Sequence, residues 1–238
     1  MKNSVRDHLY NFKLTKEDNS TFEKTNTPTE YKQQLWIQFL KNFKDLHGKS
    51  FWQDDDALEN LKPIFTYLLR DSSFFESYNL MSDLSKPSFE KGLLIIGGFG
   101  TGKTSIMKSM QECSLLFKSQ PYKIFSCNEV VQKYESSATQ LDKKEFFRQM
   151  NAGTNLFDDL ASERLASNYG QVNIMKDVLE QRYFSRKITH GTMNFKEGYP
   201  GDVEMAMKKL GEFYGPRVYD RIFEMFNVVV FKGKSRRV

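Results

Sequence analysis

Apolar positions in the first third of the chain follow the period of an α-helix. Between Thr29 and Leu46, apolar residues recur every four positions and predict a helix with one buried face: Tyr31, Leu35, Phe39 and Phe43. A second helix is expected over Asp56–Leu69, because the acidic run at 54–56 suits a helix N-terminus. The first 28 or so residues are rich in Asn, Thr, Lys and Glu, show little periodicity and predict a loose arm. Residues 1–85 are therefore interpreted as a small helical module.

Beyond residue 85 the pattern changes to short apolar runs separated by amphipathic segments. Strands are expected at Gly92–Ile96, Tyr122–Cys127, Asn155–Asp158, Lys187–Met193 and Val228–Phe231. Helices are expected at Lys103–Phe117, Glu129–Tyr134, Gln171–Arg186, Asp202–Leu210 and Pro216–Glu224. This alternation predicts an α/β domain over residues 86–238, with a parallel sheet covered by helices on both faces.

Composition narrows the class of protein. The longest apolar runs are far shorter than the roughly 20 residues of a membrane helix, and the polar start has no signal-peptide core. Two cysteines fit a reduced cytosolic protein, and together with three histidines they offer no tetrahedral zinc site. We therefore expect a soluble cytoplasmic protein with no membrane partner.

The net charge of +5 is unevenly distributed along the chain. Residues 1–90 carry −2 and residues 91–238 carry +7. Such a bias is compatible with nucleotide phosphates or nucleic acid as partners, and equally with an ordinary solvated basic surface. The densest basic cluster is formed by Lys232, Lys234, Arg236 and Arg237.

Residues 97–104 form a phosphate-binding loop of the pattern G-x-x-x-x-G-K-T, between a predicted strand and a predicted helix. The backbone N–H groups of such a loop and the helix N-terminus bind phosphate oxygens. Lys103 can reach the β- and γ-phosphates, and the Thr104 hydroxyl can ligate Mg²⁺. The candidate nucleotide-binding residues are Gly97, Gly98, Phe99, Gly100, Thr101, Gly102, Lys103, Thr104 and Ser105. A glycine-rich turn without a ligand is disfavoured by this context, but the motif alone does not separate a kinase, a GTPase and an ATP-driven motor.

Polar residues at the ends of two further strands are the next candidates. Asp158 ends an apolar strand, where it can hold Mg²⁺, and Asp159 can orient or deprotonate an attacking water. Strand C-termini line the ligand crevice of a parallel sheet, so Asn194 can position that water or sense the γ-phosphate, with Thr192 as second choice. A solvated acidic turn is the alternative for the aspartates, and we expect His190 to be structural.

Arg217 and Arg221 lie four residues apart and share one helix face. They are either an ordinary solvated pair or the source of an arginine finger, which reaches the γ-phosphate of a neighbouring subunit. Their spacing does not decide between these two interpretations.

Five segments in this order resemble the DnaC-type helicase loaders, which are AAA+ ATPases next to the IstB-like transposition ATPases: GGFGTGKTS, NLFDDLASE, NYGQVNIMKDVLEQRY, THGTMNF and GPRVYDRIFEMF. The resemblance covers residues 85–238 and implies an AAA+ core with a five-stranded parallel sheet. It also implies ATP as the nucleotide, bound between assembled subunits.

The resemblance also implies roles for single residues. Lys103 and Thr104 take Walker A places, Asp158 and Asp159 take Walker B places, and Asn194 takes the sensor-1 place. Arg221, with Arg217 beside it, takes the arginine-finger place, and either Arg236 or Arg237 takes that of a second nucleotide-sensing arginine. Asp159 stands where many AAA+ proteins have Glu, which implies slow, switch-like hydrolysis. The short stretch after Phe231 leaves no room for a helical lid, as in the loaders.

The leading hypothesis is an ATP-dependent loader in DNA replication that binds a hexameric replicative helicase through residues 1–85. It would also bind single-stranded DNA, with ATP and Mg²⁺ controlling release. One alternative is an IstB-like transposition ATPase acting on duplex DNA. Another is a nucleotide or small-molecule kinase, for which the sequence offers no lid and no acceptor pocket.

Overall fold

A computed structural model describes residues 27–167 and 170–237, so most of the polar arm predicted at the start lies outside the described residues. Its centre is a five-stranded sheet with strand order β2-β3-β6-β1-β7, and every neighbouring pair is parallel. The strands are β1 (Gly92–Gly97), β2 (Tyr122–Ser126), β3 (Thr154–Asp158), β6 (Thr189–Asn194) and β7 (Phe226–Phe231). The predicted fold class is confirmed.

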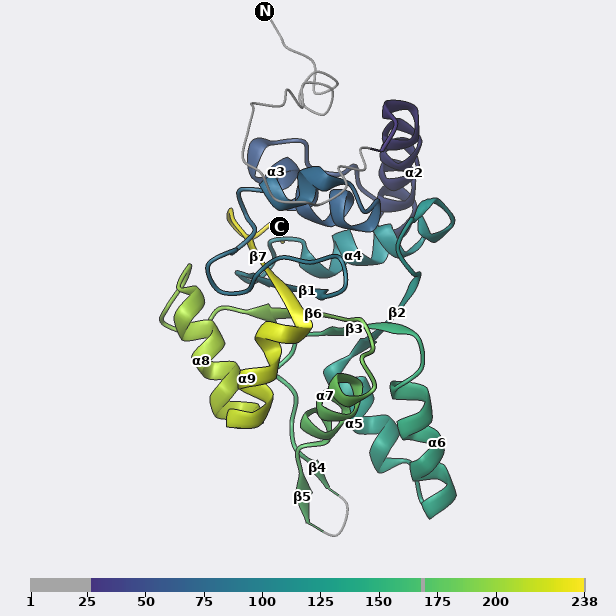
Figure 1. The fold of residues 1–238 in the computed structure, drawn as a ribbon, viewed down its shortest axis with the longest axis vertical. Coiled ribbons are helices and arrows are strands. Elements are labelled where there is room, and N and C mark those ends of the chain that lie inside the picture. The colour runs from purple at the N-terminus through teal and green to yellow at the C-terminus, as the bar shows by residue number, and fades with distance from the viewer. Residues whose placement is uncertain (1–26, 168–169, 238) are drawn as a thin grey trace, which may run out of the picture.

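The two faces of the sheet have separate hydrophobic cores. Side chains alternate along β1, so Leu93 and Ile95 lie in one buried cluster while Leu94 and Ile96 lie in the other. Figure 1 shows α2 (Thr29–His47), α3 (Asp55–Leu68) and α4 (Lys103–Gln111) on the upper face. The lower face is covered by α5 (Cys127–Glu135), α7 (Ile174–Phe184), α8 (Val203–Tyr214) and α9 (Pro216–Met225).

The helices of residues 27–85 are part of the upper core. Buried residues of α2 and α3 belong to the same cluster as Leu93, Ile95 and Val229 of the sheet. Asn79 and Met81 also bind the outer strand, through Val230 N–H to Asn79 O at 2.8 Å and Met81 N–H to Val228 O at 2.9 Å. These helices are thus a structural layer of the α/β domain, while their predicted role in partner binding stays a prediction.

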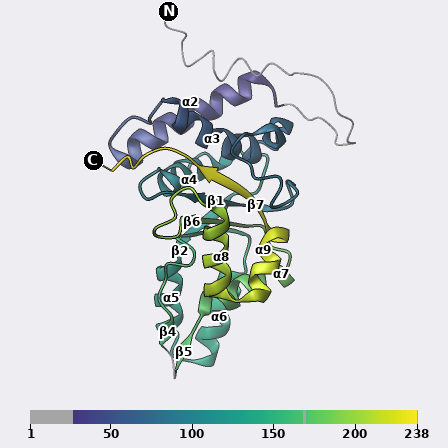
Figure 2. The same cartoon turned by 90° about the vertical axis from the view of Figure 1, so that its left-hand side faces the viewer.

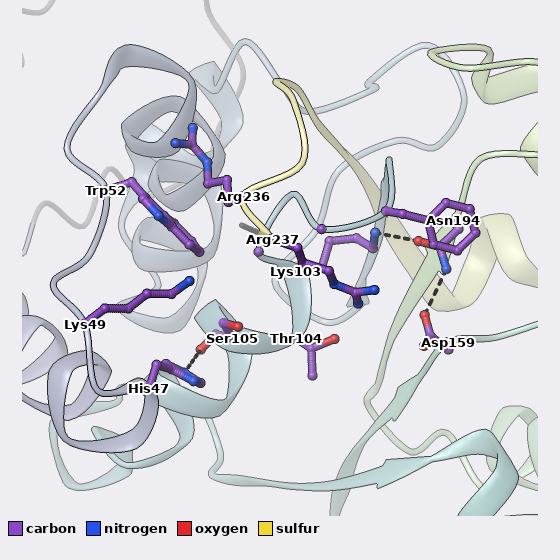
Figure 3. A pocket seen from close by; sticks show the side chains of 13 residues that line it. His47, Lys49, Trp52, Lys103, Thr104, Ser105, Asp159, Asn194, Arg236 and Arg237 are labelled. Carbon is purple, nitrogen blue, oxygen red and sulfur yellow. Dashed lines mark hydrogen bonds between the residues drawn. The ribbon is translucent and has the colours of Figure 1, made fainter.

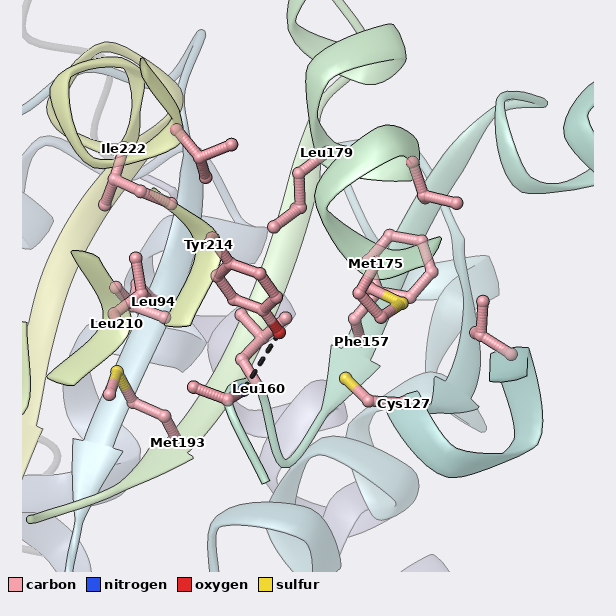
Figure 4. Packing of buried hydrophobic residues seen from close by; sticks show 14 of the residues in the cluster. Leu94, Cys127, Phe157, Leu160, Met175, Leu179, Met193, Leu210, Tyr214 and Ile222 are labelled. Atoms are coloured by element: carbon pink, nitrogen blue, oxygen red, sulfur yellow. Dashed lines mark hydrogen bonds between the residues drawn. The ribbon is translucent and has the colours of Figure 1, made fainter. Parts of the chain in front are cut away.

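The lower face extends into a thin projection. Helix α6 (Gln140–Met150) lies beside α5, and the hairpin of β4 (Ala166–Ser167) and β5 (Gln171–Val172) points away from the sheet (Figures 1 and 2). Above this projection, buried aliphatic, Met and aromatic side chains from β1, β3, α7 and α8 fill the core between the sheet and the lower helices (Figure 4). No helix within the described ranges is long and apolar enough to cross a membrane.

Several predicted boundaries are wrong for local reasons. Helix α4 ends at Gln111 and a short 3-10 helix, η2 (Ser114–Leu116), follows, in which Leu115 is almost fully exposed. Helix α7 begins at Ile174, because the Asn173 side chain accepts the Lys176 N–H and caps it, while Gln171–Val172 form a strand. Another 3-10 helix, η1 (Ser72–Glu76), follows α3. Helix α6 was not predicted, although Thr139 and Asp142 form its capping box.

Candidate nucleotide-binding site

The predicted phosphate loop joins β1 to α4 and wraps around the N-terminus of that helix (Figure 3). Gly100 and Gly102 have φ values of 74° and 95°, a region that side chains disfavour. The first N–H groups of α4 have no partner within the helix and point toward the loop. The local sequence therefore builds an anion site before any ligand contributes.

Lys103 is buried at the centre of this loop. Its Nζ donates to Gly97 O at 2.9 Å, to Gly98 O at 2.8 Å and to Asn194 Oδ1 at 2.9 Å. Burial lowers the pKa of Lys103 to about 8, although Asp159 and Asp158 act in the opposite direction. A polyphosphate would supply the negative charge that this buried ammonium group lacks.

Thr104 and Asp158 meet at the end of β3. The Thr104 hydroxyl lies 2.8 Å and 3.0 Å from the two carboxylate oxygens of Asp158. Thr192 from β6 also donates to Asp158 Oδ1, at 2.6 Å. Thr192, the second choice for the sensing residue, therefore supports the Asp158 carboxylate from the neighbouring strand.

Asp159 sits on a turn with unusual backbone geometry. Its φ is 61°, and two residues later Ala161 has a φ of 58°. Such values cost of order 1 kcal/mol or more for a residue other than glycine. Hydrogen bonds hold the turn: Asp159 N–H donates to Thr192 Oγ1 at 3.0 Å, and Asn194 Nδ2 donates to Asp159 Oδ1 at 3.0 Å. Asn194 thus links Lys103 to Asp159, as Figure 3 shows.

These groups surround a cavity of about 290 Å³. Most of its lining comes from predicted residues, including Phe99 of the loop, which is largely exposed. The structure adds three residues that the sequence analysis missed, His47, Lys49 and Trp52, all from the end of α2 and the loop after it. No motif marks them, because they reach the site only through the docking of α2 on α4, where His47 Nε2 lies 3.2 Å from Ser105 O.

The two arginines after β7 have different surroundings. The Arg236 guanidinium makes two hydrogen bonds to the Asp54 carboxylate, at 2.5 Å and 2.6 Å, and lies over the Trp52 ring. Arg237 is exposed and extends into the cavity toward Lys103 and Thr104 (Figure 3).

Arg217 and Arg221 do not line this cavity. Both lie on α9, where Arg217 is exposed and Arg221 stacks on two rings of α7, 4.7 Å from the Tyr183 centroid and 4.5 Å from that of Phe184. Arg221 Nη1 is 3.9 Å from Glu180 Oε1, and neither atom has a hydrogen-bond partner within the described part of the chain. The finger role therefore requires a second subunit and stays a prediction.

His190 is buried and its Nδ1 accepts the Leu93 N–H at 3.0 Å. Burial lowers the pKa of His190 to about 3, so the ring is neutral and serves the packing of the sheet, as expected.

The donor set fits a nucleotide with a hard divalent cation. Thr104 and Asp158 offer a hydroxyl and a carboxylate, and Mg²⁺ in phosphate-binding sites takes one or two protein oxygens with the rest from phosphates and water. The described residues hold no cluster of three or more His, Cys, Asp or Glu that would make a metal site by themselves. The arrangement thus suits a cation that arrives with the phosphates.

Several solved structures share this architecture. Over 84% of this chain and 99% of the other, the crystal structure of the DnaC helicase loader matches with a TM-score of 0.51 and 19% identity. The DnaI structure matches over 75% of this chain and 86% of the other, with a TM-score of 0.50 and 20% identity. A candidate primosome component from Streptococcus pyogenes serotype M3 matches over 77% and 84%, with a TM-score of 0.50 and 17% identity.

The chain has the fold of the DnaC-type helicase loaders. No protein-family model matches the chain, and no curated protein matches it either. The match to the DnaC loader spans about 200 residues, more than residues 86–238 contain, so it includes part of the first 85 residues. The loader fold thus extends into the N-terminal helices, whereas the motif resemblance began at residue 85.

Proposed function

We propose that this protein is an ATP-dependent loader of a replicative helicase. The observation that carries the proposal is the chain of contacts from Lys103 through Asn194 to Asp159, which unites the phosphate loop with the ends of β3 and β6 on a loader fold. A phosphate loop alone would serve many enzymes. The connection of its lysine to a carboxylate through an amide is what a hydrolysing switch needs.

Each residue of the site has a distinct role in the proposed reaction. Lys103 and the first N–H groups of α4 bind the β- and γ-phosphates, while Thr104 and Asp158 hold Mg²⁺. The cation, when bound, neutralises charge that develops on the phosphate oxygens. Asp159 orients the attacking water and accepts its proton, and Asn194 fixes the carboxylate for that step.

The side chains at the loop also suggest how nucleotide is sensed. Asn194 accepts a hydrogen bond from Lys103 and donates one to Asp159. A shift of the lysine toward phosphate would therefore change the hydrogen bond that Asn194 gives to the Asp159 carboxylate. The short Asp159 side chain, held on a turn of positive φ, favours slow hydrolysis. Slow turnover suits a timing device, in which ATP state controls release of the partner.

Hydrolysis would be completed by a second subunit. A cavity of about 400 Å³ opens beside Asp158 and is lined by Glu112 and Glu129 as well as Lys108. Its two glutamates and the aspartate suit an incoming cation, and Arg221 of a neighbouring copy is the candidate, with Arg217 beside it. This cavity supports the proposal of self-assembly through a shared ATP site.

The remaining partners are proposed from charge and exposure. The excess of +7 over residues 91–238 suits the backbone of single-stranded DNA, with binding that weakens as salt rises. Ile37 and Leu46 are exposed apolar residues on α2, with exposed fractions of 67% and 49%, and they suit contact with the helicase.

The test is transfer of a hexameric helicase onto single-stranded DNA. Purified protein with ATP and Mg²⁺ should increase the amount of helicase bound to a labelled DNA circle, and Lys103→Ala should not. A parallel assay with duplex DNA distinguishes the loader from the IstB-like alternative, which would assemble on the duplex instead. Absence of any effect of the wild-type protein on helicase loading would refute the loader function.

A further inference from the structure

Residues 232–237, which follow β7, run across the phosphate loop (Figures 2 and 3). We call this segment the strap. Arg236 N–H donates to Gly100 O at 2.9 Å, and a Cβ placed on Gly100 would lie only 2.2 Å from Ser235 Oγ. The strap and the loop are therefore in direct contact, and both this close approach and the positive φ of Gly100 favour glycine at that position.

The strap is fastened to the segment that joins α2 and α3 and to α3 itself. At one end, the buried Asn60 side chain donates to Lys232 O and accepts the Lys232 N–H, both at 2.9 Å. At the other end, Arg236 pairs with both oxygens of Asp54 and lies 5.0 Å from the Trp52 centroid. Trp52 in turn lies against Gly102, where an added Cβ would approach its ring to 2.9 Å.

The two arginines of the strap differ in whether their guanidinium groups already have a partner. The Arg236 side chain is only 15% exposed, and its guanidinium pairs with the Asp54 carboxylate and points away from Lys103 (Figure 3). The Arg237 guanidinium has no hydrogen-bond or ion-pair partner among residues 27–167 and 170–237, and it extends into the cavity beside Lys103. Unlike Arg236, it is available for an anion without breaking a contact.

We propose that Arg236 is a positioning residue that fastens the strap through Asp54 and Trp52, so that Arg237 is presented to the phosphates of the bound nucleotide. The assignment rests on the proposed nucleotide binding. Asp54 and Trp52 lie in the segment between α2 and α3, so the fastening joins the strap to this segment.

The first experiment measures ATP affinity with Mg²⁺ by calorimetry in Asp54→Asn. Asn caps a helix as well as Asp does, so α3 keeps its cap while the ion pair is lost. We expect about a tenfold weaker Kd, the range for loss of one charge-assisted contact. The matched control is Asp55→Asn, which removes the same charge one residue along and should leave Kd within about twofold.

Double variants separate positioning from direct contact. Arg237→Ala should weaken Kd roughly tenfold or more, and adding Asp54→Asn to it should change Kd less than about twofold. Arg236→Ala should match Asp54→Asn, and the pair combined should be no worse than either alone. If Arg236→Ala costs a further tenfold in the Asp54→Asn background, Arg236 contacts nucleotide itself and the assignment is wrong. An Asp54→Asn variant with wild-type affinity would overturn it as well.

The fastening is also measurable without nucleotide. The chain has two tryptophans, so Trp36→Phe leaves Trp52 as the only indole. In that background, Arg236→Ala and Asp54→Asn should increase acrylamide quenching of Trp52, and Asp55→Asn should not. Unchanged quenching would contradict the fastening. This result is independent of nucleotide, so failure of the proposed function, seen as absence of ATP binding by the wild-type protein, is distinguished from failure of the strap.

Discussion

The phosphate-loop region and the arginine-bearing helix α9 differ in how their charged side chains are satisfied. Lys103 makes three hydrogen bonds, and the polar atoms around it are supported by two strands. Arg221 has ring faces and a glutamate at 3.9 Å but an Nη1 atom without a hydrogen bond within the described residues. The first region is hydrogen-bonded before ligand binds, while the guanidinium of the second is held by ring contacts and lacks a full set of hydrogen bonds. The proposed sharing of a site between two copies makes use of this contrast.

Arg221→Ala is the strongest test of that contrast. If the guanidinium acts on a neighbour's phosphate, kcat for ATP should fall on the order of 10³-fold. The Arg221 side chain is only 18% exposed, so the free energy of unfolding of the variant should be measured alongside. Steady-state ATPase assays at protein concentrations that permit assembly measure the fall. Mixing Arg221→Ala with Lys103→Ala should restore part of the activity, because each supplies what the other lacks. Full activity of Arg221→Ala alone would contradict the shared site.

Asp159→Asn should reduce kcat by about 10²- to 10³-fold, because an amide cannot accept the proton of the attacking water. ATP affinity should stay within about twofold, since the amide keeps the size of the side chain. Single-turnover hydrolysis and calorimetry measure the two quantities. A variant that loses affinity and rate together would show that Asp159 serves binding.

Lys103→Ala should weaken ATP affinity by roughly 10²-fold, because it removes a buried charge from the phosphates. Burial already lowers the pKa of Lys103 to about 8, so the loss should not destabilise the free protein greatly. Lys144→Ala, at an exposed position of α6, is the control. Equal affinities of the two variants would exclude the loop as the phosphate site.

Tyr214→Phe probes the physical connection between the two regions. The Tyr214 hydroxyl donates to Glu163 Oε1 at 2.7 Å and accepts the Ala161 N–H at 2.9 Å, which links the Asp159 turn to the end of α8 beside α9 (Figure 4). Loss of both contacts should lower the free energy of unfolding by about 1–3 kcal/mol. Chemical denaturation measures it, with Tyr219→Phe as the control. Unchanged stability would show that the hydroxyl is not needed.

Glu163→Gln should have the smallest effect and a defined pH dependence. Burial raises the pKa of Glu163. At a pH between the unfolded and the folded pKa, the folded protein therefore keeps a proton that the unfolded chain has lost. This contribution to stability is therefore full below the usual pKa of 4.5 and is lost as pH rises through the folded pKa. The free energy of unfolding of the variant should therefore rise relative to that of the wild type as pH increases from acid to neutral, as measured by denaturation. A difference in the free energy of unfolding between variant and wild type that stays constant across pH would contradict a raised pKa of Glu163.

The parts of the fold and the site that are local in sequence could be predicted. The phosphate loop lies within eight residues, and Asp158 follows its strand directly, so pattern and spacing were sufficient. The wrong boundaries at Gln111 and Ile174 reflect a 3-10 turn and a single capping side chain, which apolar spacing does not encode. The roles of Trp52 and Asp54 beside the phosphate loop could not be predicted, because they depend on contacts with Gly102 and Arg236, and Arg236 lies 182 residues from Asp54.

The common core of the sheet and the N-terminal helices has a consequence for folding and for any shortened form of the protein. Leu93, Ile95 and Val229 are fully buried under α2 and α3. A chain starting at residue 86 would expose this apolar face of the sheet to water and should aggregate, however complete its phosphate loop. The two halves should therefore melt in one cooperative transition, and a mutation in α2 can inactivate the distant hydrolytic residues simply by lowering the melting temperature.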